Sequence, residues 1–283
     1  MSSAQAAAAP SFARTRAVLG TFAGNPTGTV RFALRSSWLL LAVALYVPLH
    51  VLWRSFGAPS PWSQRFLAVA ARACGVRVST AGALRLHDVF YVANHLSWID
   101  ICILGGATGT AFVSQDKIRD WPIIGWLARL NRTVFISRTD RMTVGSQVDE
   151  LRAALADRQP VAIFPEGTTT DGRSLLPFKA SLFAVLLPPP AGAERPNHHR
   201  ELVIQPVLLD FDEAGKSLAW IGEETAPENA WRVLSRPGTF DVMVRFLEPF
   251  DPGNHPHRKM ITAEARRRIA AALSASLGGM PVD

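Results

Sequence analysis

The sequence predicts an α/β fold in which a mixed β-sheet is covered by helices, with an N-terminal helical hairpin that anchors the chain to a membrane. From Val76 onward, short apolar runs that indicate strands alternate with helical patterns, which is typical of a sheet covered on both faces. Ahead of this region, the run from Trp38 to Trp53 is the longest apolar stretch, and Arg35 and Arg54 flank it. Flanking arginines and bracketing tryptophans are features of a membrane interface.

Residues 1–30 are rich in Ala, Ser, Gly and Thr and lack a sustained apolar face, so we expect a mostly disordered tail there. The apolar run that follows begins too late for a cleavable signal peptide. Its 16 residues would reach about 24 Å as a helix, short of a hydrocarbon core of about 30 Å. A second segment, Trp62–Cys74, has apolar side chains on one face and arginines on another. We therefore expect residues 31–75 to form a helical hairpin in one leaflet, with a single transmembrane span or a buried soluble helix as alternatives.

Charge is concentrated in the first third of the chain. Residues 1–87 contain nine arginines and no acidic residue, whereas the remainder has 21 basic and 23 acidic residues. Basic side chains interleaved with Leu, Val and Trp favour an anionic membrane surface, and we expect no nucleic-acid partner. Cys74 and Cys102 lie in apolar surroundings without metal-ligand spacing, which indicates reduced core thiols in a protein that faces the cytosol.

Residues 76–283 are expected to form one domain. Its expected strands are 76–80, 85–93, 110–114, 133–137, 161–164, 202–209 and 240–247. Its expected helices are 97–105, 122–130, 142–157, 180–187 and 262–277. The Pro-rich and His-rich stretch 188–200 indicates an exposed loop within this domain.

The most informative strand end is Asn94-His95, where the apolar run Val89–Ala93 stops and a helical pattern begins at Ser97. Strand ends of α/β sheets are where such folds usually place ligands. A helical turn that folds back can bring Asp100 to the His95 imidazole, fix its tautomer and raise its basicity. An imidazole held in this way can take a proton from a hydroxyl as it attacks an acyl group. The pair alone leaves open a purely structural, hydrogen-bonding histidine.

Three further strand ends carry special residues. The run Val161–Phe164 leads into Pro165-Glu166-Gly167-Thr168, where Gly167 permits close backbone approach and amides could bind an oxyanion. Lys179 adds a cation just before the expected helix 180–187. The strand at Val134 ends in Arg138, and the strand at Val203 is interrupted by Pro206. An ordinary strand–loop–helix connection is the alternative for each end taken alone.

In this order and spacing, the four strand ends resemble the glycerolipid acyltransferase family typified by bacterial 1-acylglycerol-3-phosphate acyltransferase. The matching blocks are Asn94–Asp100, Phe135–Arg138, Phe164–Thr168 and Gln205–Val207, and the resemblance covers roughly residues 36–250. It implies that His95 is a general base that deprotonates a lysolipid hydroxyl and that Asp100 orients it. It also implies an acyl thioester donor, either acyl-CoA or acyl carrier protein, and no metal or redox cofactor.

The remaining site residues follow from the same resemblance. The residues implied to bind substrate are Asn94, Arg138, Glu166, Gly167, Thr168, Thr169 and Lys179. Arg138, Glu166 and Gly167 are implied to shape the acceptor site. Because of the N-terminal hairpin we also expect membrane lipids as partners, and we expect the protein at the cytoplasmic face of the inner membrane.

Two departures from the family pattern bear on the acceptor. Arg132-Thr133 stand where the second block usually opens with Gly, and Thr169 stands where the third block usually has an arginine that holds the acceptor phosphate. Loss of that planar cation removes a natural partner of a phosphate monoester. The region 166–179 is instead similar to the branch that includes bacterial lyso-ornithine lipid acyltransferases. Lyso-ornithine lipid is thus the expected acceptor, with lysophosphatidic acid as the alternative if Lys179 or Arg138 binds phosphate.

Rival functions remain open at this point. A catalytically silent lipid-binding protein could have the same fold, although it would not need an intact His95–Asp100 pair. A thioester hydrolase could use the same base with water. No Gly-x-Ser-x-Gly elbow exists, so Ser97 fits a helix N-cap better than a nucleophile. The glycines at 105–109 follow a predicted helix rather than a strand, so they do not indicate a dinucleotide site.

Overall fold

In the computed structural model, residues 25–57, 60–136, 159–186 and 202–282 are described. Within these ranges seven strands form one sheet in the order β1-β7-β6-β2-β5-β3-β4. Neighbouring strands are parallel except β6 and β7, which are antiparallel, so the predicted mixed sheet is confirmed. The strands are β1 (Val76–Ala81), β2 (Val89–Ala93), β3 (Ala111–Gln115), β4 (Val134–Ile136), β5 (Val161–Ile163), β6 (Val203–Asp210) and β7 (Phe240–Phe246).

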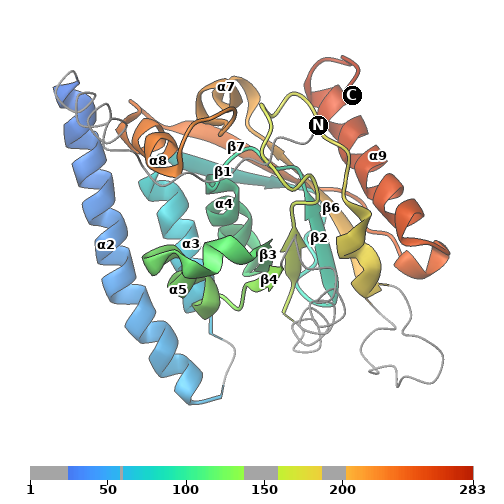
Figure 1. Ribbon diagram of the computed structural model, residues 1–283, viewed down its shortest axis with the longest axis horizontal. Helices are drawn as coiled ribbons and strands as arrows, with labels where there is room; N and C mark the ends of the chain where they lie inside the picture. The colour runs from blue at the N-terminus through green and yellow to red at the C-terminus, as the bar shows by residue number, and fades with distance from the viewer. Residues whose placement is uncertain (1–24, 58–59, 137–158, 187–201, 283) are drawn as a thin grey trace.

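Helices lie around this sheet (Figure 1). The α-helices are α2 (Pro26–Ser55), α3 (Trp62–Ala73), α4 (Ile99–Thr108), α5 (Pro122–Leu130), α7 (Gly215–Leu218), α8 (Ala226–Ser235) and α9 (Arg258–Ser276). Short 3₁₀ helices are η1 (Asp116–Asp120), η3 (Ala180–Leu186), η5 (Asp212–Ala214) and η6 (Pro252–Asn254). The expected helix 180–187 is therefore a 3₁₀ helix, and the expected helix 142–157 lies outside the described residues.

Alternation along β2 shows that both faces of the sheet are covered. All five β2 residues are buried. Val89, Tyr91 and Ala93 pack into one apolar cluster with residues of α3, α4 and α8, whereas Phe90 and Val92 pack into a second cluster with residues of η3 and α9. Because successive side chains of a strand point to opposite faces, the two clusters lie on opposite sides of the sheet. β2 begins at Val89 rather than at the predicted residue 85.

The long helix α2 begins four residues before the end of the predicted tail. The Asn25 side chain accepts the Gly28 amide at 2.9 Å and caps the helix, so residues 26–30 are helical. Pro48 lies inside α2 without ending it. With 30 residues, α2 is long and apolar enough to cross a membrane, and little of its apolar stretch is buried.

The second predicted anchor helix, α3, packs on α2 and turns its buried residues toward the core. Leu67, Ala70 and Ala71 are buried in the cluster that also contains β2 residues. α4 packs closely against α3. The backbone of Ala68 lies so near Gly106 that a Cβ atom there would be only 2.7 Å from it. The glycines at 105 and 106 therefore allow this close helix contact. The predicted boundary at residue 75 falls inside a packed cluster of side chains.

Candidate active site

The site lies where β2 and β5 end. These strands are parallel neighbours, with Val92 paired to Ile163, so the residues that follow them meet at one edge of the sheet. His95 leaves the end of β2 and Glu166 leaves the end of β5. Sequence analysis placed both residues at strand ends, and the fold brings those two ends together.

His95 and Asp100 form the predicted pair. His95 Nδ1 lies 2.7 Å from Asp100 Oδ2, and the backbone amides of Leu96 and Ser97 donate to the same oxygen at 2.6 and 2.9 Å. The Asp100 side chain is fully buried, whereas 19% of the His95 side chain is exposed. A carboxylate that accepts two amides favours a proton on Nδ1 of the imidazole, so Nε2 carries the lone pair.

Phe164 supports the imidazole from one side. The His95 and Phe164 rings stack with centroids 4.2 Å apart and an interplanar angle of 15°. Phe164 also stacks on Phe112 of β3 at 6.0 Å. In the sequence Phe164 is visible only as part of a motif, and no role is expected for it. Its position directly before Pro165 in the block Phe164–Thr168 is the signal that could have identified it.

Glu166 is buried and holds two backbone segments. Its Oε1 accepts the His95 amide at 2.8 Å and its Oε2 accepts the Leu176 amide at 2.9 Å. Burial raises the pKa of Glu166 to about 7, although the two amide hydrogen bonds act in the opposite direction. Its carboxyl group therefore fixes the backbone position of His95 and the return of the chain at Leu176.

Asn94 and Thr170 complete the support of the histidine. The Asn94 side chain donates to the Leu209 carbonyl at 3.0 Å and accepts the Leu209 amide at 2.8 Å, which ties the end of β2 to β6. The Thr170 amide donates to the His95 carbonyl at 2.8 Å. His95 is thus held by backbone bonds from both sides, and only its ring reaches the surface.

The other predicted substrate residues lie around this support. Gly167 adopts a positive φ of 72°, and its amide donates to the Phe164 carbonyl. Thr168 is exposed, whereas the Thr169 hydroxyl donates to the Trp220 carbonyl. Lys179 is exposed, and its amide donates to the Pro165 carbonyl at 2.9 Å. Arg138 lies outside the described residues.

Helix α8 braces the turn that follows His95, a contribution that sequence analysis missed. Asn229 is fully buried, and its Oδ1 accepts the Trp98 indole N–H at 2.9 Å. Its Nδ2 donates to Glu224 at 2.8 Å, and Arg232 pairs with the same carboxylate at 2.6 Å. Thr225 and Glu228 form a capping box at the start of α8, a signal that could have located this helix.

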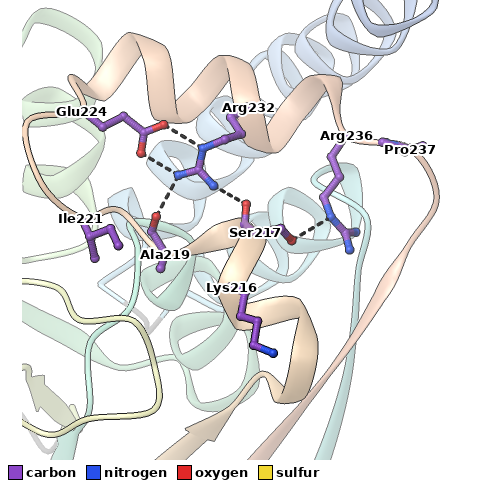
Figure 2. Close-up of a pocket in the computed structure, with 8 residues that line it drawn as sticks. All are labelled: Lys216, Ser217, Ala219, Ile221, Glu224, Arg232, Arg236 and Pro237. Atoms are coloured by element: carbon purple, nitrogen blue, oxygen red, sulfur yellow. Dashed lines mark hydrogen bonds and ion pairs between the residues drawn. The ribbon is translucent and has the colours of Figure 1, made fainter.

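Figure 2 shows a surface pocket between α7 and α8, where the Arg232 guanidinium lies between Glu224 and the carbonyls of Ser217 and Ala219. The pocket has a volume of about 650 Å³, and His95 does not line it. Trp220, which lies between the lining residues Ala219 and Ile221, donates its amide to the Leu96 carbonyl at 2.9 Å.

Among the described residues, no group of three or more His, Cys, Asp or Glu side chains is placed to hold a metal ion. Cys74 and Cys102 are buried and unpaired by disulfide. Burial raises the pKa of the Cys74 thiol to about 12 and also raises that of Cys102.

Comparison with known proteins identifies relatives of this arrangement. The family model described as "Acyltransferase" matches residues 75–209. The chain is 34% identical over 264 residues to the lyso-ornithine lipid O-acyltransferase of Rhizobium meliloti (strain 1021), covering 88% of each chain. It is 32% identical over 209 residues to a 1-acyl-sn-glycerol-3-phosphate acyltransferase of Neisseria gonorrhoeae, covering 73% of this chain and 78% of the relative.

A solved structure shares the fold. The crystal structure of the 1-acyl-sn-glycerophosphate acyltransferase of Thermotoga maritima matches with a TM-score of 0.61 at 20% identity, covering 90% of this chain and 100% of the other. The family match spans the strands that deliver His95, Asp100 and Glu166, and the relatives extend along most of the chain. The chain therefore belongs to the acyltransferase family.

Proposed function

We propose that this acyltransferase moves a fatty acyl group from a thioester to the hydroxyl of a lysolipid, with His95 as the general base. The observation that carries the proposal is the 2.7 Å contact between a partly exposed imidazole and a fully buried carboxylate. Asp100 holds the proton on Nδ1, so Nε2 is the nitrogen that takes the proton of the acceptor hydroxyl. A catalytically silent lipid-binding protein would have no use for this pair.

The proposed reaction moves one proton and one acyl group, and it uses only the His95 imidazole and the two substrates. As Nε2 takes the hydroxyl proton, the hydroxyl oxygen forms a bond to the thioester carbonyl carbon. The carbon–sulfur bond then breaks, and the imidazolium returns the proton to the leaving thiolate. The donor is acyl-CoA or acyl carrier protein, and the Asn94 and Glu166 bonds to neighbouring backbone keep the imidazole in place during both proton transfers.

Lyso-ornithine lipid is the acceptor that we propose. Relatives that bear this name align along 86–90% of this chain, whereas the named 1-acyl-sn-glycerol-3-phosphate acyltransferases of Neisseria align along 73%. Thr169 supports the same choice, because its hydroxyl is engaged by the Trp220 carbonyl at a position where the phosphate-binding relatives' pattern has arginine. An acceptor with an amino-acid head group does not need that cation.

The chain works at a membrane, and we propose the cytoplasmic face of the inner membrane. Helix α2 is long and apolar enough for insertion, and most of its apolar stretch is exposed. Thioester donors are made and kept in the cytosol, and reduced buried cysteines fit the same side of the membrane. Lysolipid could then reach His95 while its acyl chain stays in lipid.

Substitution of the base tests the catalytic proposal. We expect His95→Ala to lower the rate of acyl transfer by about a thousandfold, because a positioned general base contributes about 10²–10⁴-fold. His257→Ala, at an exposed histidine before α9, is the matched control and should retain the parent rate. Unfolding temperatures should be similar for all three proteins. Retention of acyl transfer within about tenfold of the parent by folded His95→Ala would remove the general-base role.

A further inference from the structure

Helix α5 exposes its apolar residues and buries a glycine. Ile123 and Ile124 are 60% and 51% exposed, and Trp121 and Trp126 are also exposed. By helical periodicity Ile123, Trp126 and Leu127 share one face. A surface helix of a water-soluble domain turns such a face toward the core. Within α5, however, Gly125 is the one buried residue.

The reason for this orientation is the close packing of α5 on η1. A Cβ atom at Gly125 would lie 2.2 Å from the Arg119 carbonyl oxygen and 2.7 Å from that of Ile118. Only a glycine allows the two segments to approach this closely. The Arg129 guanidinium donates to the Arg119 carbonyl at 3.0 Å and fixes the same contact. Because the Gly125 side of α5 packs on η1, the apolar side chains of α5 point outward.

The end of α5 lies against α2. His50 of α2 contacts the Leu130 backbone at the end of α5, and next to it Val51, Leu52 and Trp53 are exposed. Figure 1 shows α5 on the same side of the sheet as α2 and α3, with α9 at the opposite end of the molecule. The exposed apolar residues of α5 therefore lie near this part of α2.

Cations border this surface. Between residues 116 and 132 the chain has four basic and two acidic residues. Arg119 stacks on the Phe135 ring at 5.2 Å, beside α5. Burial and the nearby positive charge of Arg54 both lower the pKa of Arg132, which shows that α2 and the end of α5 bring like charges together. Anionic lipid head groups would offset this repulsion.

We propose that α5 is a second membrane-inserting element, whose exposed apolar residues Ile123, Ile124 and Trp126, together with Trp121 at its N-cap, enter the same leaflet as the outer face of α2. The occupant is a lipid surface with anionic head groups. A second copy of the chain would cover the apolar face but would bring a further set of arginines to it. Exposed tryptophans and isoleucines bordered by arginine are typical of helices that lie in a bilayer interface.

This inference builds on the membrane location in the proposed function, and it adds an anchor beyond α2. η1 and α5 follow the carboxyl end of β3, the strand whose neighbour β5 leads to Glu166. Because β2, β5 and β3 are parallel neighbours, η1 leaves the sheet at the edge that carries His95. An inserted α5 would therefore keep this edge of the sheet close to the lipid.

Site-directed labelling tests this inference. A polarity-sensitive fluorophore is attached to Ile124→Cys, to Leu45→Cys on α2 and to Met260→Cys on α9, which has a similar exposure of 48%. Cys74 and Cys102 are buried and do not compete for the label. The full chain is reconstituted in vesicles of phosphatidylethanolamine and phosphatidylglycerol. We expect brominated acyl chains to quench the labels at 45 and 124, and aqueous iodide to quench the label at 260.

The outcomes separate this proposal from its rivals. Iodide quenching at 124 without lipid quenching would place α5 in water and overturn the inference. Shielding at 124 that depends on protein concentration rather than on lipid would assign the face to a second copy and also overturn it. The double variant Ile123→Ser with Ile124→Ser should weaken vesicle binding at least about tenfold, and Met260→Ser should not. Acyl transfer to a detergent-dispersed lysolipid, measured on the same variants, tests the enzymatic proposal separately.

Discussion

Glu166 shows how one buried carboxyl group at the site makes stability depend on pH. Its unfolded pKa is near 4.5, and burial raises the folded value to about 7. The folded protein therefore binds this proton more tightly than the unfolded chain. The stabilisation from Glu166 is fully present below pH 4.5 and is lost as pH rises through 7, a change of about 3 kcal/mol at about 1.4 kcal/mol per pKa unit.

The substitution Glu166→Gln tests this linkage. Glutamine does not ionise, so the difference in unfolding free energy between parent and variant should shift in favour of the variant as pH rises from 4.5 through 7. Denaturation of both proteins across this range in one detergent measures the difference. Glu213→Gln, at an exposed carboxyl, is the control and should show no such shift. A parent-to-variant difference that stays constant with pH would mean that Glu166 does not titrate in this window.

Much of the site at residue scale could be predicted from the sequence, because it depends on local spacing. Asp100 reaches His95 within one turn of chain, and the amides of Leu96 and Ser97 come with that turn. The support from Asn229 could not be predicted, since it arrives from a helix more than a hundred residues later. The packing of Phe164 on His95 likewise depends on the pairing of two strands.

At the scale of elements, Arg35 joins α2 to the domain. Its guanidinium donates to carbonyls of Val233, Leu234, Arg236 and Gly238, at the end of α8 and in the turn that follows. Phe32 adds a ring contact of 5.0 Å with Trp231. The sequence showed Arg35 only as a charge that flanks an apolar run. Its partners lie some two hundred residues away, and no local pattern indicates them.

We expect Arg35→Ala to lower the free energy of unfolding by about 2 kcal/mol, because it leaves several partly buried carbonyls without their charged donor. The matched control is Arg77→Ala, which removes a solvent-exposed pair with Asp241 and should change stability little. Chemical denaturation in mild detergent compares the two variants. Equal effects of the two substitutions would show that α2 is not held through Arg35.

At the scale of the whole molecule, one mixed sheet carries both the site residues and the helices packed on its faces. The mixed sheet and its two covered faces could be predicted because apolar strands and helical patterns alternate from Val76 onward. The division into anchor and domain was harder to predict, since α3 is amphipathic and an amphipathic helix fits either a membrane interface or the face of a domain core. The close packing of α3 on α4 depends on the glycines at 105 and 106. The sequence alone does not show that a second helix packs against these glycines.

The choice of acceptor is the most direct test of the proposed function. The purified full chain receives a labelled acyl carrier protein thioester, with lyso-ornithine lipid and lysophosphatidic acid together in one reaction, and the labelled products are separated by chromatography. We expect label in ornithine lipid, because Thr169 leaves no arginine at the position of the phosphate clamp. Label mainly in phosphatidic acid would mean that another cation binds the phosphate and would contradict the acceptor. Label only in free fatty acid would contradict acyl transfer itself.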